Sequence, residues 1–338
     1  MVRPGRSRRT FLAGSLAVFG WYRYANAQAK RVPRVGVVFL HARGDAAGTE
    51  DENALVEAFR SKGYVDGTNV VLERRYLGGR MELYPDQVAD LVARPVDVLV
   101  VSTRPGARAA VRATSTIPIV VYSAGDPVAA GFAATYARPG GNLTGVTTHS
   151  VSLAPKRLEL LKSAVPKLNR VVSLTIGKGA RSLEEWHEYQ RNEDEAARRL
   201  GLSIERIETL DTDNIHEFLD KAAKTRPDGV LIEGSSTFFL NRREVGRFLL
   251  VNRLPAVSAG REYVMEGALL AYWQPEDYER VASLVDQILR GAKPASLPIE
   301  LAAKYFLSVN LKTAKALGII LPRSLLQQAD HVVPAERR

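Results

Sequence analysis

The stretch Val96-Asp97-Val98-Leu99-Val100-Val101-Ser102-Thr103 decides the fold class of this chain. Its apolar side chains from 98 to 101 are continuous rather than alternating, which is typical of a parallel strand buried on both faces. A helix expected over 106–113 follows it, and a second apolar strand is expected over 117–122. Strand, helix and strand in this order predict a parallel α/β sheet with right-handed connections.

The same alternation continues in both directions from this stretch. On the N-terminal side, the pattern predicts strands over 35–40 and 70–72 and helices over 51–62 and 85–93. The turn-rich stretch 140–145 then separates a second series, and it is interpreted as part of a crossing between two lobes. In that series a capping box at Ser182 opens a helix that ends at Gly201. The remaining predicted elements are helices over 155–165, 214–224 and 242–252 and strands over 171–176, 204–207, 229–233, 256–258 and 268–270.

The first 29 residues have the composition of an export leader. Arg8-Arg9 precede an apolar run from Phe11 to Trp21, and Ala27-Gln28-Ala29 has the small-x-small form of a cleavage site. Arg23 ends the apolar run short of the ~20 residues that a spanning helix needs, so a cleaved twin-arginine signal is preferred to a membrane anchor. The mature chain is expected to be a soluble periplasmic protein, and its length, beyond the ~100 to 200 residues usual for one domain, predicts two lobes.

Charge and cysteine content exclude several classes of protein. The chain carries 47 basic and 37 acidic residues, and five of the basic residues lie in the leader, so the rest has a net charge of +5 rather than +10. These basic residues are mixed with acids, and no long basic run with interleaved aromatics indicates a nucleic-acid partner. No cysteine occurs, which excludes a lipoprotein, disulfides and thiolate metal sites.

Six stretches carry a resemblance to a known family, and they occur in the same order as in that family: FRSKGY (59–64), TSTIPIV (114–120), GDPV (125–128), ARPGGNLTG (137–145), KRLELLK (156–162) and NLKTAKALG (310–318). They are similar to the ABC-transporter substrate-binding proteins of the type I periplasmic-binding fold, in the group with tryptophan- and tyrosine-binding members. The resemblance spans essentially the whole mature chain.

The resemblance implies an α/β protein of two Rossmann-like lobes with parallel sheets, joined by three crossover segments. By analogy, lobe one takes residues 31–146 and 274–304, lobe two takes 147–273 and 305–330, and 331–338 form a C-terminal tail. The implied function is capture of a small polar solute, an amino acid or related organic acid, and its delivery to an ABC permease in the inner membrane. A protein that presents its ligand to a membrane sensor is the alternative with the same fold.

The ligand site is expected beyond the carboxyl ends of the strands, where helix N-termini offer free N–H groups. Hydroxyls at these ends suit a carboxylate and an acid suits an ammonium. The candidate ligand-binding residues are Ser102, Thr103, Ser123, Asp126, Glu233, Ser235, Tyr272 and Trp273.

A purely structural role competes with ligand binding at most of these positions. Asp126 is equally placed to cap the element that follows it. Ser102 and Thr103 are also candidates for local caps, but their place at the end of the most apolar strand favours the cleft. Tyr272 and Trp273 follow the expected strand 268–270, and they either stack on a flat ligand or pack near a hinge. The neighbouring pair Phe238 and Phe239 is expected to begin a buried helix rather than to line the site.

Three departures from the family pattern bear on the ligand. Arg104 stands where relatives have small residues, and it either favours an acidic ligand or extends into solvent. Relatives carry an acid within the stretch that corresponds to 234–237, and Glu233 is interpreted as its substitute. Trp273 replaces a glycine that is common in relatives. Specificity for tryptophan or tyrosine therefore does not transfer to this chain.

A nucleotide-cofactor enzyme is the rival interpretation from another class. The stretch 177–182 is a degenerate dinucleotide fingerprint, but Ser182 replaces its last glycine and Glu208 lies beyond the ~20 residues expected for a ribose-binding acid. The five histidines lack metal-ligand spacing. No catalytic residue, cofactor or metal site is expected.

Overall fold

The computed structural model describes residues 31–335 apart from 148–152, 178–182, 210–213 and 303. Residues 32–338 form one compact unit. The predicted leader, the capping box at Ser182 and most of the stretch 177–182 lie outside the described residues, so they stay predictions.

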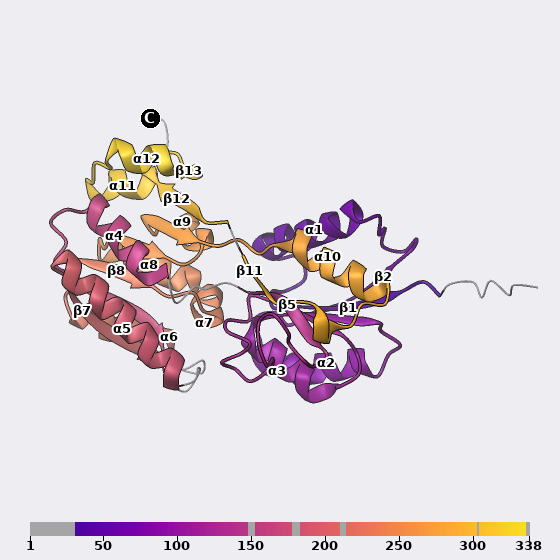
Figure 1. Cartoon of the computed structure of the whole chain (residues 1–338). Helices are drawn as coiled ribbons and strands as arrows, with labels where there is room; N and C mark the ends of the chain where they lie inside the picture. Colours follow the sequence, from indigo (N-terminus) through magenta and orange to yellow (C-terminus); the bar gives the residue numbers. More distant parts are fainter. Residues whose placement is uncertain (1–30, 148–152, 178–182, 210–213, 303, 336–338) are drawn as a thin grey trace, which may run out of the picture. The chain divides into compact units, whose positions relative to one another are not determined.

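Six parallel strands form the first sheet, in the order β11-β5-β4-β3-β1-β2 (Figure 1). Two pairs of helices cover its two faces, α1 with α10 on one core cluster and α2 with α3 on the other. We call this sheet and its helices lobe one. Its strands are β1 Arg34–Phe39, β2 Val71–Tyr76, β3 Val98–Ser102, β4 Ile119–Tyr122, β5 Leu143–Thr147 and β11 Glu300–Leu301. Its helices are α1 Ala46–Ser61, α2 Tyr84–Val92, α3 Thr103–Ala113 and α10 Tyr278–Leu289, with short 3-10 turns at Met81–Leu83 and Pro294–Ser296.

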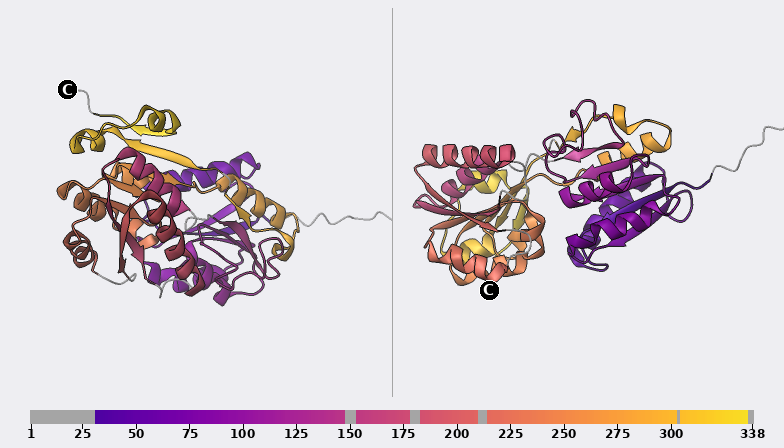
Figure 2. Two further views of the ribbon diagram at one scale, coloured as in Figure 1. Left: turned by 60° about the vertical axis from the view of Figure 1, so that its left-hand side comes forward. Right: turned by 90° about the horizontal axis from the view of Figure 1, so that it is seen from below.

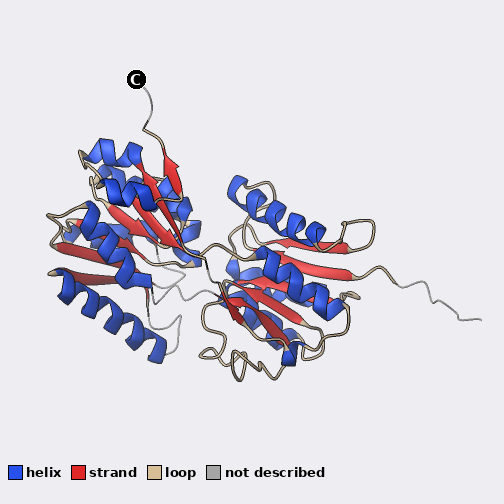
Figure 3. Ribbon diagram, turned by 45° about the horizontal axis from the view of Figure 1, so that its top comes forward, coloured by secondary structure: helices blue, strands red, loops and turns tan. Residues whose placement is uncertain are grey.

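Seven strands form the second sheet, in the order β13-β12-β10-β9-β8-β6-β7. All its pairs are parallel except β10 with β12. Helices again cover both faces (Figure 3), and we call this sheet and its helices lobe two. Its strands are β6 Arg170–Ile176, β7 Ser203–Thr209, β8 Gly229–Ile232, β9 Ala256–Ser258, β10 Leu270–Trp273, β12 Phe306–Asn310 and β13 His331–Val333. Its helices are α4 Ala154–Ala164, α5 Leu183–Leu200, α11 Leu311–Leu317 and α12 Arg323–Gln328 on one core cluster, and α6 Ile215–Lys224, α7 Ser236–Leu240, α8 Arg242–Val251 and α9 Arg261–Met265 on the other.

Strand β3 confirms the prediction made from its continuous apolar run. It lies between β1 and β4, and all five of its residues are buried. Val98 and Val100 contribute to the core under α1 and α10, while Leu99 and Val101 contribute to the core under α2 and α3. Apolar side chains are needed at consecutive positions because both faces of this strand are covered.

The chain passes between the two sheets three times, after β5, after β10 and after β11, so the predicted two-lobed fold with three crossovers is confirmed (Figure 2). The first crossing comes later than predicted. Leu143–Thr147, the end of the turn-rich stretch and the two residues after it, is strand β5 of the first sheet. Close packing of β4 and β5 requires glycine at position 145, because a Cβ there would lie 2.1 Å from the Val121 carbonyl oxygen.

The second sheet differs from the prediction at two places. Tyr272 and Trp273 belong to β10 itself, because the strand covers 270–273 rather than 268–270. His331–Val333, assigned above to a C-terminal tail, forms the edge strand β13 and pairs in parallel with β12. Strands this short and partly exposed carry too few apolar side chains to be read from periodicity.

Candidate functional site

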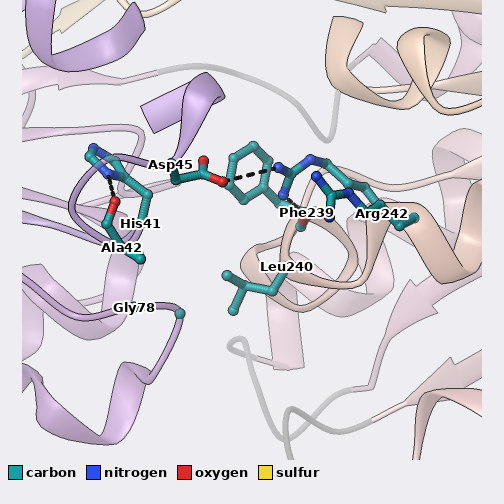
Figure 4. Close-up of a pocket in the computed structure, with 9 residues that line it drawn as sticks. His41, Ala42, Asp45, Gly78, Phe239, Leu240 and Arg242 are labelled. Carbon is teal, nitrogen blue, oxygen red and sulfur yellow. Dashed lines mark hydrogen bonds and ion pairs between the residues drawn. The ribbon is translucent and has the colours of Figure 1, made fainter. Parts of the chain in front are cut away.

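A cavity of about 1140 Å³ lies at the carboxyl ends of strands from both sheets. The residues that follow β1, β3 and β4 line it from lobe one, and those that follow β8, β9 and β10 line it from lobe two. A smaller pocket of about 220 Å³ shares His41, Asp45, Phe239, Arg242 and Arg243 with this cavity (Figure 4). The site therefore lies where parallel α/β sheets offer free backbone groups at strand ends.

The structure brings seven of the eight candidate residues to this cavity. Tyr272 is not among the lining residues, whereas its neighbour Trp273 is. Successive side chains of a strand point to opposite faces, so only one residue of this pair can face the cavity. The Tyr272 ring stacks on Tyr305 instead, with ring centroids 5.7 Å apart and an interplanar angle of 7°. The seven residues at the cavity are Ser102, Thr103, Ser123, Asp126, Glu233, Ser235 and Trp273.

Tyr84 organises the end of strand β3. Its hydroxyl donates to the Ser102 carbonyl oxygen at 3.0 Å and accepts from Thr103 Oγ1 at 3.1 Å. Burial raises the pKa of Tyr84, so the hydroxyl stays protonated as a donor. Thr103 has a backbone φ of 66°, a left-handed conformation that is costly for a β-branched residue. Thr103 Oγ1 also accepts from the Gly106 N–H at 3.4 Å, whereas Ser102 makes no side-chain cap.

The segment after β4 contributes a second hydroxyl. Ser123 Oγ donates to Glu276 Oε1 at 2.9 Å. Asp126 Oδ1 accepts from the N–H groups of Val128 and Ala129 at 2.8 and 2.9 Å. The capping interpretation of Asp126 is therefore correct, although a turn rather than a helix follows it.

The wall from lobe two is held by internal contacts. Glu233, 6% exposed, accepts from the Thr175 hydroxyl and from the Ile176 N–H at 3.2 Å. Ser235 Oγ accepts from the Phe238 N–H at 3.2 Å and so caps α7. Phe238 is fully buried, as predicted, but Phe239 lines the cavity, contrary to the prediction for this pair. Two consecutive residues of a short helix point in different directions, which the prediction ignored.

Nine acidic residues and five arginines line this cavity. Of these, the sequence analysis proposed only Asp126 and Glu233 as ligand contacts and discussed Arg104. The Arg242 guanidinium lies 3.9 Å from an Asp45 carboxylate oxygen, and Arg261 pairs with Glu50 (Figure 4 shows the former). These two ion pairs join helices of lobe two to helix α1 and its N-cap residue in lobe one. Their spacing in sequence gives no signal, because the partners belong to different lobes.

Three acids that were not predicted lie close enough to influence one another. Asp51 comes from α1, Glu262 from α9 and Glu276 from the crossing after β10. The pKa of Asp51 is raised to about 7, mainly by burial and also by the negative charges of Glu276 and Glu262. The Tyr278 hydroxyl and Arg261 oppose this shift. Burial first, and Glu276 among the charges, also raises the pKa of Glu262. We call Asp51, Glu262 and Glu276 the acidic triad.

The Asp51→Asn variant should change the pH dependence of stability. The folded pKa of about 7 exceeds the ordinary 3.8, so the folded chain binds this proton more tightly, and wild-type stability falls as pH rises between these values. We expect the variant to raise the free energy of unfolding near pH 8 by about 1 to 2 kcal/mol, allowing for solvent screening, and to leave it unchanged near pH 4. Urea denaturation at the two pH values measures this.

The matched control is Asp220→Asn, at an exposed position on α6. It should leave stability unchanged at both pH values. Equal stability of Asp51→Asn and the wild type near pH 8 would contradict the raised pKa.

No three histidine or acidic side chains of the described residues are grouped as a metal site, and none of the described helices is long and apolar enough to cross a membrane. Two α/β lobes with a cavity at the carboxyl ends of strands from both sheets define the class of two-lobed solute-binding proteins. The chain belongs to the family of ABC transporter substrate binding proteins, which it matches over residues 41–333. It is thus an extracytoplasmic component of the kind that supplies an ABC permease with a small molecule.

Three relatives illustrate the similarity. A tyrosine-binding protein of Clostridioides difficile (strain R20291) is 23% identical over 275 residues, covering 79% of this chain and 76% of that protein. An ABC domain from Streptococcus pneumonia in complex with L-Trp has a TM-score of 0.78 at 23% identity, covering 89% and 99% of the two chains. A conserved domain protein from Vibrio cholerae has a TM-score of 0.78 at 24% identity, covering 89% and 100%. The two structures share the fold of this chain.

Proposed function

We propose that this protein captures a small polar solute, an amino acid or related organic acid, in the cavity of about 1140 Å³ and delivers it to an ABC permease. The observation that carries the proposal is the convergence of strand ends from both lobes on this one cavity. Solute that touches both lobes favours the conformation in which they are close, and the three crossovers act as the hinge. The lobe boundaries predicted above enter the proposal, with lobe one extended to Thr147 and lobe two to Val333.

The relatives support an amino-acid ligand. Their descriptions state binding of tyrosine and of L-Trp. An amino acid needs donors for its carboxylate and acids for its ammonium, and this cavity offers both kinds of group. We propose that the seven candidate residues at the cavity contact the solute, with the hydroxyls of Ser102, Thr103 and Ser123 toward the carboxylate.

The proposal treats the protein as a binding protein without catalytic activity. It also includes export through the predicted twin-arginine leader, cleavage after Ala29 and release into the periplasm as a soluble protein without a lipid anchor. The absence of cysteine from the sequence supports the last point.

Thermal unfolding with a panel of amino acids, dicarboxylates, sugars and nicotinamide cofactors tests the proposal. A solute at 100 times its Kd should stabilise the protein by about 2.7 kcal/mol. Small-angle scattering with the same solute should show a smaller radius of gyration, because the lobes close on it. No stabilisation by any amino acid or organic acid would contradict the proposal, and stabilisation by nicotinamide cofactors alone would favour an enzyme.

A pair of threonine variants locates the binding in the cavity. Thr103→Val removes a cavity hydroxyl, and we expect it to weaken solute binding roughly fivefold to tenfold, the worth of one neutral hydrogen bond. Thr116→Val removes an exposed hydroxyl from a residue that does not line the cavity, so it should leave the affinity unchanged. Equal affinities of the two variants would place the solute elsewhere.

A further inference from the structure

The charges around the cavity do not balance one another. Nine acidic side chains line it against five arginines. Three of the arginines, 242, 261 and 243, already form ion pairs with Asp45, Glu50 and Glu266. The cations that act on the triad are Arg261, which is shared with Glu50, and Arg242, which is shared with Asp45. Negative charge is therefore concentrated at one part of the wall.

Neutral groups hold the triad in place and add no positive charge to it. The Tyr278 hydroxyl bonds to Asp51, and the Ser123 hydroxyl bonds to Glu276. The Glu262 carboxylate folds back over Gly260, where a Cβ would lie 2.6 Å from Glu262 Oε2. Carboxylates fixed in this way by separate elements are prepared for a positive partner, because they cannot relax away from one another.

Two further side chains of the same cavity keep a buried polar atom without a partner among the described residues. His41 is 8% exposed and its Nε2 has no hydrogen bond, while its Nδ1 lies 2.9 Å from the Ala42 carbonyl oxygen (Figure 4). Tyr263, next to Glu262, is 3% exposed and its hydroxyl has no hydrogen bond. Buried polar atoms normally find partners, so these two indicate that ligand atoms complete the wall.

We propose that the solute is an amino acid with a cationic side chain, and that one of its positive groups binds among Asp51, Glu262 and Glu276. This inference rests on the proposed function. A neutral amino acid carries one ammonium and one carboxylate, so it would leave the excess of negative charge in place. A basic amino acid brings one further positive charge and offsets part of this excess. The solute class thus differs from the tryptophan and tyrosine stated for the relatives.

A metal ion fits these residues less well than an organic cation. The three carboxylates interact electrostatically. Within the described residues, however, no three acidic or histidine side chains are grouped closely enough to hold one metal ion. An ammonium or guanidinium group is larger and donates several hydrogen bonds, so it can contact carboxylates that are further apart. The aromatic rings of Tyr122 and Tyr278 beside the triad add a favourable surface for such a cation.

Isothermal titration with matched pairs of amino acids tests the inference. L-Arginine and L-citrulline differ by the positive charge of the guanidinium, and L-lysine and L-norleucine differ by the terminal ammonium. We expect one basic member to bind at least about tenfold tighter than its neutral analogue, as a charge-assisted hydrogen bond implies. Tryptophan, tyrosine, glutamate and putrescine complete the panel.

Variants assign the effect to the triad. Glu262→Gln should weaken binding of the basic amino acid about tenfold or more and leave the neutral analogue unaffected. The control is Glu217→Gln, because Glu217 also occupies the first turn of a lobe-two helix but does not line the cavity. Retained helicity by circular dichroism shows that both variants fold.

The outcomes separate this inference from the proposed function. Tighter binding of a neutral amino acid, or an unchanged affinity in Glu262→Gln, overturns the inference while the proposed function stands. Binding of no amino acid overturns the inference, and it contradicts the proposed function as well if no organic acid of the thermal panel binds either. Binding of putrescine without any amino acid overturns the assignment to amino acids.

Discussion

Replacing Gly145 by alanine should destabilise the protein by at least about 3 kcal/mol, the largest effect that we expect from a single methyl group. Gly145 lies in β5 opposite Val121 of β4. A Cβ there would lie 2.1 Å from the Val121 carbonyl oxygen and 2.8 Å from its nitrogen. These are backbone atoms of a strand within the sheet, so they cannot move aside without breaking the β3–β4 or β4–β5 pairing.

Urea denaturation followed by circular dichroism measures this change. The control is Gly141→Ala, four residues earlier in the same stretch, where a Cβ would meet no atom within 4 Å. It should leave stability almost unchanged. A Gly145→Ala protein as stable as Gly141→Ala would show that β4 and β5 are not paired as described.

Arg157→Met should lower the free energy of unfolding by about 3 to 5 kcal/mol, the range found when one partner of a buried ion pair is removed. Arg157 is 2% exposed, and its Nε donates to the Tyr272 carbonyl oxygen at 2.8 Å. Burial lowers the pKa of Arg157 to about 10, and the charge of Glu233 is among the groups that oppose this shift. Arg157 is therefore still charged at neutral pH, and its loss leaves both Glu233 and a carbonyl in β10 less well compensated.

The double variant Arg157→Met with Glu233→Gln isolates the charge effect. It should be more stable than the sum of the two single variants predicts by at least about 1 kcal/mol, because the buried carboxylate is no longer charged. The measurement is a double-mutant cycle in urea. Additive effects would mean that Glu233 and Arg157 do not interact.

Most of the fold could be predicted because both sheets leave a clear pattern in the sequence. The run 98–101 is apolar at every position, and the structure buries it on both faces. The pattern failed where local sequence does not determine pairing. Residues 143–145 looked like part of a turn because the stretch 140–145 contains three glycines, and residues 331–333 were assigned to a tail by analogy with the family. Both segments become strands through contacts with distant parts of the chain.

The candidate site could be predicted in position but not in composition. Seven of the eight residues proposed from strand ends line the cavity, because parallel sheets always bring these ends together. Ligand contact by them stays a prediction. Asp51 and Glu262 were missed because they lie on helices, where an acid is ordinarily a solvated residue. Only the packing of α1, α9 and the crossing after β10 brings the acidic triad together.

The late position of β11 and β12 in the chain has a consequence for biosynthesis. β11 completes the first sheet, and β12 lies between β10 and β13 in the second. Both strands belong to residues 300–310, so a ribosome has translated strands β1 to β10 before either sheet can close. Until then β5 and β10 expose unpaired strand edges, which readily associate with other chains. Nascent molecules of this protein should therefore depend on chaperones until β11 and β12 have been synthesised, and neither lobe should fold as an independent unit before then.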